Sequence, residues 1–177
     1  MRFKLHGRLQ DQTQRRYFFV LSQKEAELVS NAFVGWEAAL DRFPDIAFDV
    51  REATVCWALF RHSASVYHSV QITERGLLEL GTFLGVNDPH SGWTAVTNAL
   101  EKVVRKQHRE RTEFERENFQ NIEQIFGTVQ ALKNAWRNKI SHAQGRLVLM
   151  GNDFGAERAE EILLATRAFM RRLAEDI

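Results

Sequence analysis

The sequence is poor in several residues that mark other classes of protein. Its 177 residues include one cysteine, Cys56, so no intramolecular disulfide can form, as is usual in a reducing cytoplasm. Only two prolines are present, Pro44 and Pro89, and this leaves room for long uninterrupted helices. The formal net charge is +1, so any affinity for nucleic acid has to come from local clustering of basic residues.

Long apolar runs are also missing. No run approaches the roughly 20 residues that cross a bilayer as a helix, and the N-terminal stretch MRFKLHGRLQDQTQRR has no apolar centre of the signal-peptide type. We therefore expect a cytoplasmic protein without membrane attachment. Hydrophobic residues make up 44% of the chain and charged residues 27%, which predicts a folded domain with an ordinary core.

Apolar residues recur in steps of three and four along most of the chain, which predicts helices. The predicted helices cover residues 22–41, 49–84, 93–104, 118–143 and 156–175. The first of them opens with a capping-box pattern, Ser22-Gln23-Lys24-Glu25. Residues 102–117 carry charges of both signs, as solvated segments do, and residues 146–150 are predicted to form a short strand or a buried connector.

The predicted fold is all-α, a bundle of four to five helices with an N-terminal extension. Residues 1–48 form the extension and the first helix, which we expect to pack on the bundle. Residues 49–177 form the bundle itself. We find no internal repeat, linker or low-complexity tract in the sequence.

The hexapeptide Arg137-Asn138-Lys139-Ile140-Ser141-His142 closes the predicted helix 118–143. An arginine can hold a phosphate through two parallel hydrogen bonds, and a histidine can move protons near neutral pH. Arg137, Asn138 and His142 are therefore the candidate catalytic residues for cleaving a phosphodiester without a metal. On a regular helix, positions five apart lie about 140° around the axis, so Arg137 and His142 need either a distortion near Ser141 or cooperation between two protomers.

The hexapeptide also resembles the signature of the HEPN superfamily, which is Arg, a polar residue, and His four to six positions after the Arg. Arg137, Asn138 and His142 fit that signature. The resemblance covers roughly residues 51–177. It includes the stretches 74–80, 133–138 and 167–173.

The resemblance implies a HEPN-type helical bundle and a metal-independent endoribonuclease in a prokaryotic toxin–antitoxin or phage-defence system. RNA would be the substrate, and an antitoxin or another defence-system protein would be a partner. No cofactor and no metal is expected. Members of the superfamily form homodimers in which two Arg–His motifs line one cleft, and this would supply both an acid and a base.

Two other functions fit the same residues. Some members of the superfamily are catalytically silent scaffolds that bind RNA or a protein partner. The third interpretation is a helical oligomerisation module in which Arg137 pairs with a glutamate and His142 caps a helix.

One residue after the motif differs from a known group of toxins. Toxins silenced by a nucleotidyltransferase carry a tyrosine two positions after the histidine, where this chain has Gln144. This argues against that mode of regulation.

The remaining histidines and the cysteine are not arranged as a metal site. His62 and His68 lie six positions apart, which gives no shared face for a metal, so we expect both to be satisfied within the fold. His90 and His108 are placed in a loop and in the charged segment. We expect Cys56, between Val55 and Trp57, to be a buried structural thiol.

The four tryptophans lie at apolar helical spacing and are predicted to pack in the core. They are Trp36, Trp57, Trp93 and Trp136. Trp136 is the exception that we keep open for stacking on a base, because it precedes Arg137. Glu74 is predicted to be a helix-surface residue or, alternatively, to orient the motif arginine.

Overall fold

The computed structural model describes residues 20–88, 90, 92–140 and 154–176, and of residues 136–140 it describes the backbone only. Every regular element in these residues is helical, which confirms the predicted all-α class. The α-helices are α2 (Gln23–Ser30), α3 (Glu37–Arg42), α4 (Ala47–Ala58), α5 (His62–Phe83), α6 (Trp93–Arg105), α7 (Glu113–Glu117), α8 (Phe119–Ile140) and α9 (Ala156–Asp176). Two 3-10 helices cover Pro44–Ile46 (η1) and His108–Glu110 (η3).

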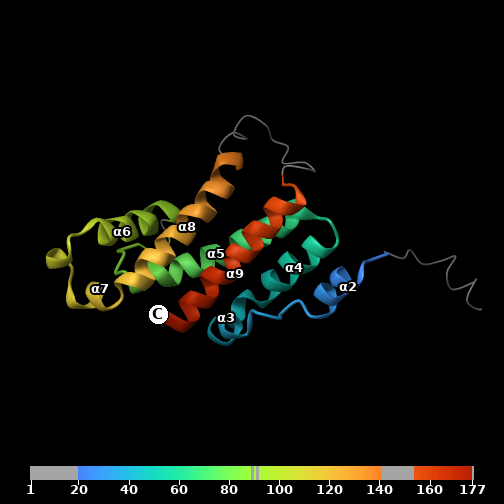
Figure 1. Cartoon of the computed structure of the whole chain (residues 1–177), viewed down its shortest axis with the longest axis horizontal. Helices are drawn as coiled ribbons and strands as arrows, with labels where there is room; N and C mark the ends of the chain where they lie inside the picture. Colours follow the sequence, from blue (N-terminus) through green and yellow to red (C-terminus); the bar gives the residue numbers. More distant parts are fainter. Residues whose placement is uncertain (1–19, 89, 91, 141–153, 177) are drawn as a thin grey trace, which may run out of the picture.

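The central helix is α5, which packs against α4 on one side and α9 on another (Figure 1). It runs antiparallel to α4, because His68 of α5 bonds Asp49 at 2.7 Å while Arg75 bonds Asp45, which precedes α4, at 2.8 Å. Its neighbour α9 runs parallel to it. One contact between these two helices is a buried hydrogen bond of 3.2 Å between the hydroxyls of Thr73 and Thr166.

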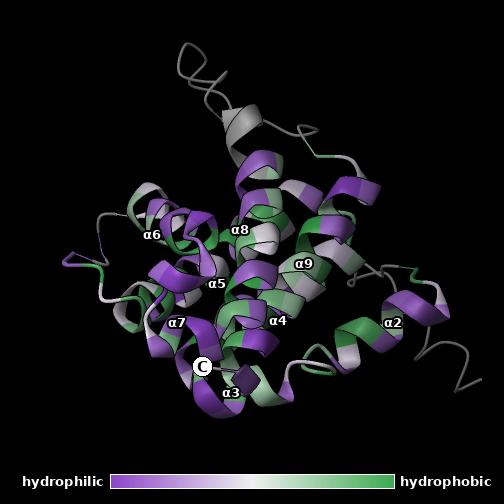
Figure 2. Cartoon of the chain, turned by 60° about the vertical axis from the view of Figure 1, so that its left-hand side comes forward, coloured by the Kyte–Doolittle hydropathy of each residue, from purple (hydrophilic) through white to green (hydrophobic). Residues whose placement is uncertain are grey.

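Helix α8 lies between α6 and α9. Lys106 at the end of α6 bonds Glu115 of α7 at 2.5 Å, just before α8 begins. Further along α8, Lys133 donates to the Thr97 hydroxyl of α6 at 3.2 Å, so α6 and α8 are antiparallel. Figure 2 shows hydrophilic and hydrophobic residues alternating along both helices, as expected for amphipathic helices with one packed face.

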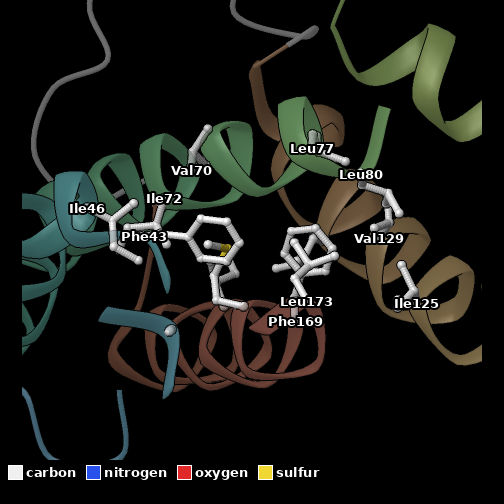
Figure 3. Close-up of a cluster of buried hydrophobic side chains, with 14 of the residues drawn as sticks. Phe43, Ile46, Val70, Ile72, Leu77, Leu80, Ile125, Val129, Phe169 and Leu173 are labelled. Atoms are coloured by element: carbon white, nitrogen blue, oxygen red, sulfur yellow. The ribbon is translucent and has the colours of Figure 1, made fainter. Parts of the chain in front are cut away.

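The hydrophobic core is built mainly by α5, α8 and α9. Figure 3 shows apolar side chains of these three helices converging between their axes. The large side chains that are completely or almost completely buried include Phe43, Ile72, Leu80, Leu100, Ile122, Ile125, Phe169, Met170 and Leu173. The contacts of Phe43 join the N-terminal extension to this core.

The first predicted helix is two helices in the structure. The predicted capping box is present: the Glu25 amide donates to Ser22 Oγ at 3.3 Å and the Ser22 amide donates to Glu25 Oε2 at 2.6 Å. The helix that it opens ends at Ser30, and α3 begins only at Glu37. Gly35, with φ +81°, lies in the turn between them, a backbone conformation that glycine adopts readily.

The prediction of one long helix over residues 49–84 is wrong. The chain turns back between α4 and α5, and Phe60 has φ +60°. The Arg61 amide donates to the Cys56 carbonyl at 2.8 Å, which is the bond that closes a helix with a left-handed residue after its end. The apolar stripe continues across this turn because both helices bury one face in the same core, so periodicity alone does not reveal the break.

The later helices lie close to their predicted bounds. The sequence predicts helices over residues 93–104, 118–143 and 156–175. In the structure, α6 covers 93–105, α8 covers 119–140 and α9 covers 156–176. The charged segment 102–117 becomes the end of α6, η3 and α7. The predicted strand or connector at 146–150 lies outside the described residues. None of the helices described is both long and apolar enough to cross a membrane.

Candidate functional site

The last described turn of α8 carries two of the three motif residues. The helix covers Phe119–Ile140, so the backbones of Arg137 and Asn138 are helical and hold them close together. His142 lies outside the described residues. The last described turn of α8, which carries Arg137 and Asn138, lies at one end of the bundle (Figure 1).

Two rows of residues lead along α8 to the motif. Lys133 faces α6, because it bonds Thr97 there, and position 137 is one turn further along the same row. Ala131 and Ala135 face α9, and position 138 continues their row. Helical geometry thus places the backbone of Arg137 on the side toward α6 and that of Asn138 on the side toward α9.

On the α9 side, a small pocket of about 120 Å³ lies between the two helices. Its floor is apolar and includes Leu132 and Ile162, whereas Arg158 and Glu161 lie at its rim. These two rim residues bond each other at 3.2 Å, and both are more than half exposed. Such an exposed pair contributes little to stability. Arg158 is therefore a cation near the motif whose ion pair the fold does not need.

On the α6 side, a larger pocket of about 400 Å³ opens between α5 and the start of α6. We call it the α5–α6 pocket. It is lined by Gln71, Glu74, Arg75, Leu77, Leu78, His90, Gly92 and Trp93. Its size falls in the range of small-molecule sites, and its lining combines apolar, amide, carboxylate and aromatic groups.

The α5–α6 pocket has one wall that is held in place by a hydrogen bond. Trp93 Nε1 donates to Glu74 Oε1 at 3.3 Å, which ties the first residue of α6 to the exposed face of α5. The predicted packing of Trp93 in the core is confirmed in part, because the ring is partly buried against the core and also lines the pocket.

The only described arginine in this pocket already serves the fold. Arg75 donates from Nε to Asp45 at 2.8 Å and from Nη1 to Glu79 at 3.4 Å. Partial burial works to lower the pKa of Arg75, but the hydrogen bonds and charges of Asp45 and Glu79 prevail and raise that pKa above its ordinary value. Arg75 also lies over the ring of Phe43, with 5.2 Å between its guanidinium carbon and the ring centroid.

The two histidines of α5 and the cysteine of α4 are partly or fully buried. His68 is satisfied by Asp49, as predicted, whereas His62 has a buried Nδ1 without a hydrogen-bond partner. Cys56 is buried, as predicted, and burial raises the pKa of its thiol. The described part of the chain contains no group of three or more histidine, cysteine or carboxylate side chains that could hold a metal.

Sequence reasoning missed the α5–α6 pocket as a site. Gln71, Glu74 and Trp93 look like ordinary members of amphipathic helices, and His90 looks like a loop residue. Only the return of the chain after α5 brings Trp93 beside Glu74. No local spacing signals a contact between positions 19 residues apart in two helices.

Comparisons with models of protein families, with curated proteins and with solved structures give no match for this chain.

Proposed function

We propose that this protein is a metal-independent endoribonuclease of the HEPN type. The observation that supports the proposal best is the position of Arg137 and Asn138 in the last described turn of α8, at the end of the helix pair where the α5–α6 pocket opens. An arginine can hold a phosphate through two parallel hydrogen bonds, and an aromatic side chain can stack on the neighbouring base.

The proposed reaction needs no group beyond the motif residues of two protomers. One His142 accepts the proton of the ribose 2′-OH, and the 2′-oxygen attacks the adjacent phosphorus. The bond from phosphorus to the 5′-oxygen breaks, and a second His142 gives a proton to that oxygen. The products are a 2′,3′-cyclic phosphate and a free 5′-OH.

Arg137 and Asn138 have supporting roles in this proposal. Arg137 stabilises the charge that develops on the phosphate oxygens in the transition state. Asn138 orients the phosphate or the histidine. Because each protomer supplies one His142 and the reaction needs an acid and a base, we propose a two-fold homodimer. A prokaryotic toxin–antitoxin or phage-defence context, with a protein antitoxin as a partner, belongs to the same proposal.

The test is RNA cleavage by the purified protein in the presence of EDTA. We expect cleavage to persist, and we expect His142→Ala and Arg137→Ala to lower its rate by about 10²- to 10⁴-fold without lowering the melting temperature. The matched controls are His108→Ala and Arg109→Ala, because these residues are exposed in η3, beyond the opposite end of α6.

Three outcomes separate the interpretations. A catalytically silent scaffold would bind RNA or a protein partner but show no cleavage to lose. An oligomerisation module would neither bind nor cleave, and its motif variants would at most change stability. Full activity of His142→Ala would rule out the catalytic role of the motif.

A further inference from the structure

We propose that the α5–α6 pocket binds a guanine base of the RNA strand, with Glu74 reading its hydrogen-bonding edge and Trp93 forming the stacking wall. This inference rests on the proposed function, because it assigns a substrate subsite to the same molecule. It also makes Glu74 a specificity-determining residue, a role that the motif residues do not fill.

The pocket lies at the motif end of the α6–α8 pair. Lys133 and Thr97 bond each other across these antiparallel helices. Trp93 is one turn before Thr97, and Arg137 is one turn after Lys133, a rise of about 6 Å along each axis. The backbone of Arg137 and Trp93 therefore lie on the same side of the Lys133–Thr97 contact, at the same end of the α6–α8 pair.

The charges in the pocket favour a base over a phosphate. Arg75 is its only described arginine or lysine, and that guanidinium is already bonded to Asp45 and Glu79. Glu74 adds a carboxylate, which repels a phosphate. A neutral, planar and polar group is the ligand that these side chains tolerate.

Among the four RNA bases, guanine complements Glu74 best. A carboxylate has two oxygens with about four acceptor positions, and the Trp93 indole uses one of these. Guanine presents two neighbouring N–H donors, N1–H and the N2 amino group, on its Watson–Crick edge, and a carboxylate accepts both side by side. Gln71 lines the same pocket and can donate an amide N–H to the guanine O6 atom.

Trp93 supplies the second element of recognition. Its ring is fixed at the indole nitrogen by Glu74 and lines the pocket. Stacking on an aromatic side chain stabilises any base in single-stranded nucleic acid. The stacking sets affinity, and the Glu74 contact sets the preference among bases.

The experiment measures binding of oligonucleotides that cannot be cleaved. The probes are two labelled single-stranded octamers of 2′-O-methyl RNA, one made only of uridine and one with a single central guanosine. By fluorescence anisotropy, the wild-type protein should bind the guanosine probe at least about tenfold more tightly. Glu74→Gln should lose this preference, because an amide replaces one acceptor oxygen with a donor. Glu74 is exposed, so the folded state should tolerate this change.

Two further variants control the result. Glu123→Gln removes an exposed carboxylate of α8 that does not line the pocket, and it should keep the guanosine preference. Trp93→Ala should weaken binding of both probes by about tenfold or more, whereas Trp93→Phe should retain most of it. Melting temperatures of all variants show whether the fold is intact.

Failure of this inference and failure of the proposed function are distinguishable. Cleavage of unmodified RNA that depends on His142, together with equal binding of the two probes, would overturn the guanine subsite and leave the nuclease intact. A guanosine preference that Glu74→Gln abolishes, without any cleavage, would support the subsite in a protein that binds RNA but does not cut it. Absence of both activities would overturn both.

Discussion

Gly76 of α5 lies directly against Phe169 of α9 in the core. A Cβ atom at position 76 would lie 2.6 Å from Phe169 Cε1 and 2.6 Å from Met170 Sδ, closer than ordinary van der Waals contact. Any larger residue at position 76 therefore requires these side chains of α9 to shift. Phe169, Met170 and Leu173, which a Cβ atom at position 76 would meet, all belong to the hydrophobic core.

Gly76→Ala should destabilise the protein by about 1–3 kcal/mol, because Phe169 and its neighbours have to shift in a packed core. The expected fall in melting temperature is roughly 2–10 °C for a chain of this length. Gly127→Ala is the matched control, since position 127 is exposed in α8 with nothing within 4 Å. It should stabilise the protein by about 0.5–1 kcal/mol through helix propensity. Equal melting temperatures of the two variants would contradict the close contact.

Phe60→Gly should stabilise the protein by roughly 1 kcal/mol. Phe60 has φ +60° and its side chain is 64% exposed, so it occupies a position after a helix end where glycine relieves backbone strain. Phe60→Ala keeps a Cβ atom and should not share the gain. Thermal unfolding of the three proteins checks this, and a loss of stability in Phe60→Gly would mean that the ring contact with His62 outweighs the strain.

The Lys106–Glu115 bond should make stability depend on pH at the acidic end. Burial opposes the shift, but the hydrogen bond from Lys106 prevails and lowers the pKa of Glu115 below its ordinary value. A group with a lowered folded-state pKa stabilises the protein above the unfolded-state pKa of about 4.3, and this stabilisation is lost as the pH falls through the folded-state value.

Glu115→Gln should therefore melt below the wild type near neutral pH, and the difference should shrink as both are acidified toward about pH 3. Glu113→Gln, an exposed neighbour in α7, should show no such convergence. Melting curves at several pH values measure both. A constant difference across the acidic range would rule out the linkage.

Cys56 should not react with a thiol reagent in the folded protein. Its side chain is 2% exposed, and burial raises the pKa of the thiol despite the opposing charge of Arg61, so little thiolate forms near neutral pH. Modification should proceed at the rate of unfolding. Rapid labelling under native conditions would show that the core around Cys56 in α4 opens easily.

If the protein cleaves RNA as proposed, a single 2′-deoxy substitution at the cleaved linkage should abolish the reaction, because the attacking oxygen is missing. On unmodified RNA the 5′ fragment should end in a 2′,3′-cyclic phosphate and the 3′ fragment should begin with a free 5′-OH, which mass spectrometry identifies. Arg137→Lys should restore only part of the activity lost in Arg137→Ala, since a lysine cannot form the bidentate contact. Cleavage of the deoxy-substituted linkage would exclude the 2′-OH mechanism.

Local sequence was enough to predict much of the helical structure. The Ser22–Glu25 capping box forms because its two hydrogen bonds join residues three positions apart. The helices at 93–105, 119–140 and 156–176 follow from apolar spacing along one face. The motif residues 137 and 138 were located on a helix for the same reason.

Tertiary structure decided the features that depend on contacts between distant positions. The turn at Phe60 carries neither glycine nor proline, and its two flanking helices bury faces in one core, so the hydrophobic pattern runs through it unchanged. The α5–α6 pocket needs Trp93 and Glu74 side by side, and the close approach at Gly76 needs Phe169 opposite it. Periodicity tells which face of a helix is buried, but it carries no information about the helix that covers that face, because burial is satisfied by any apolar partner.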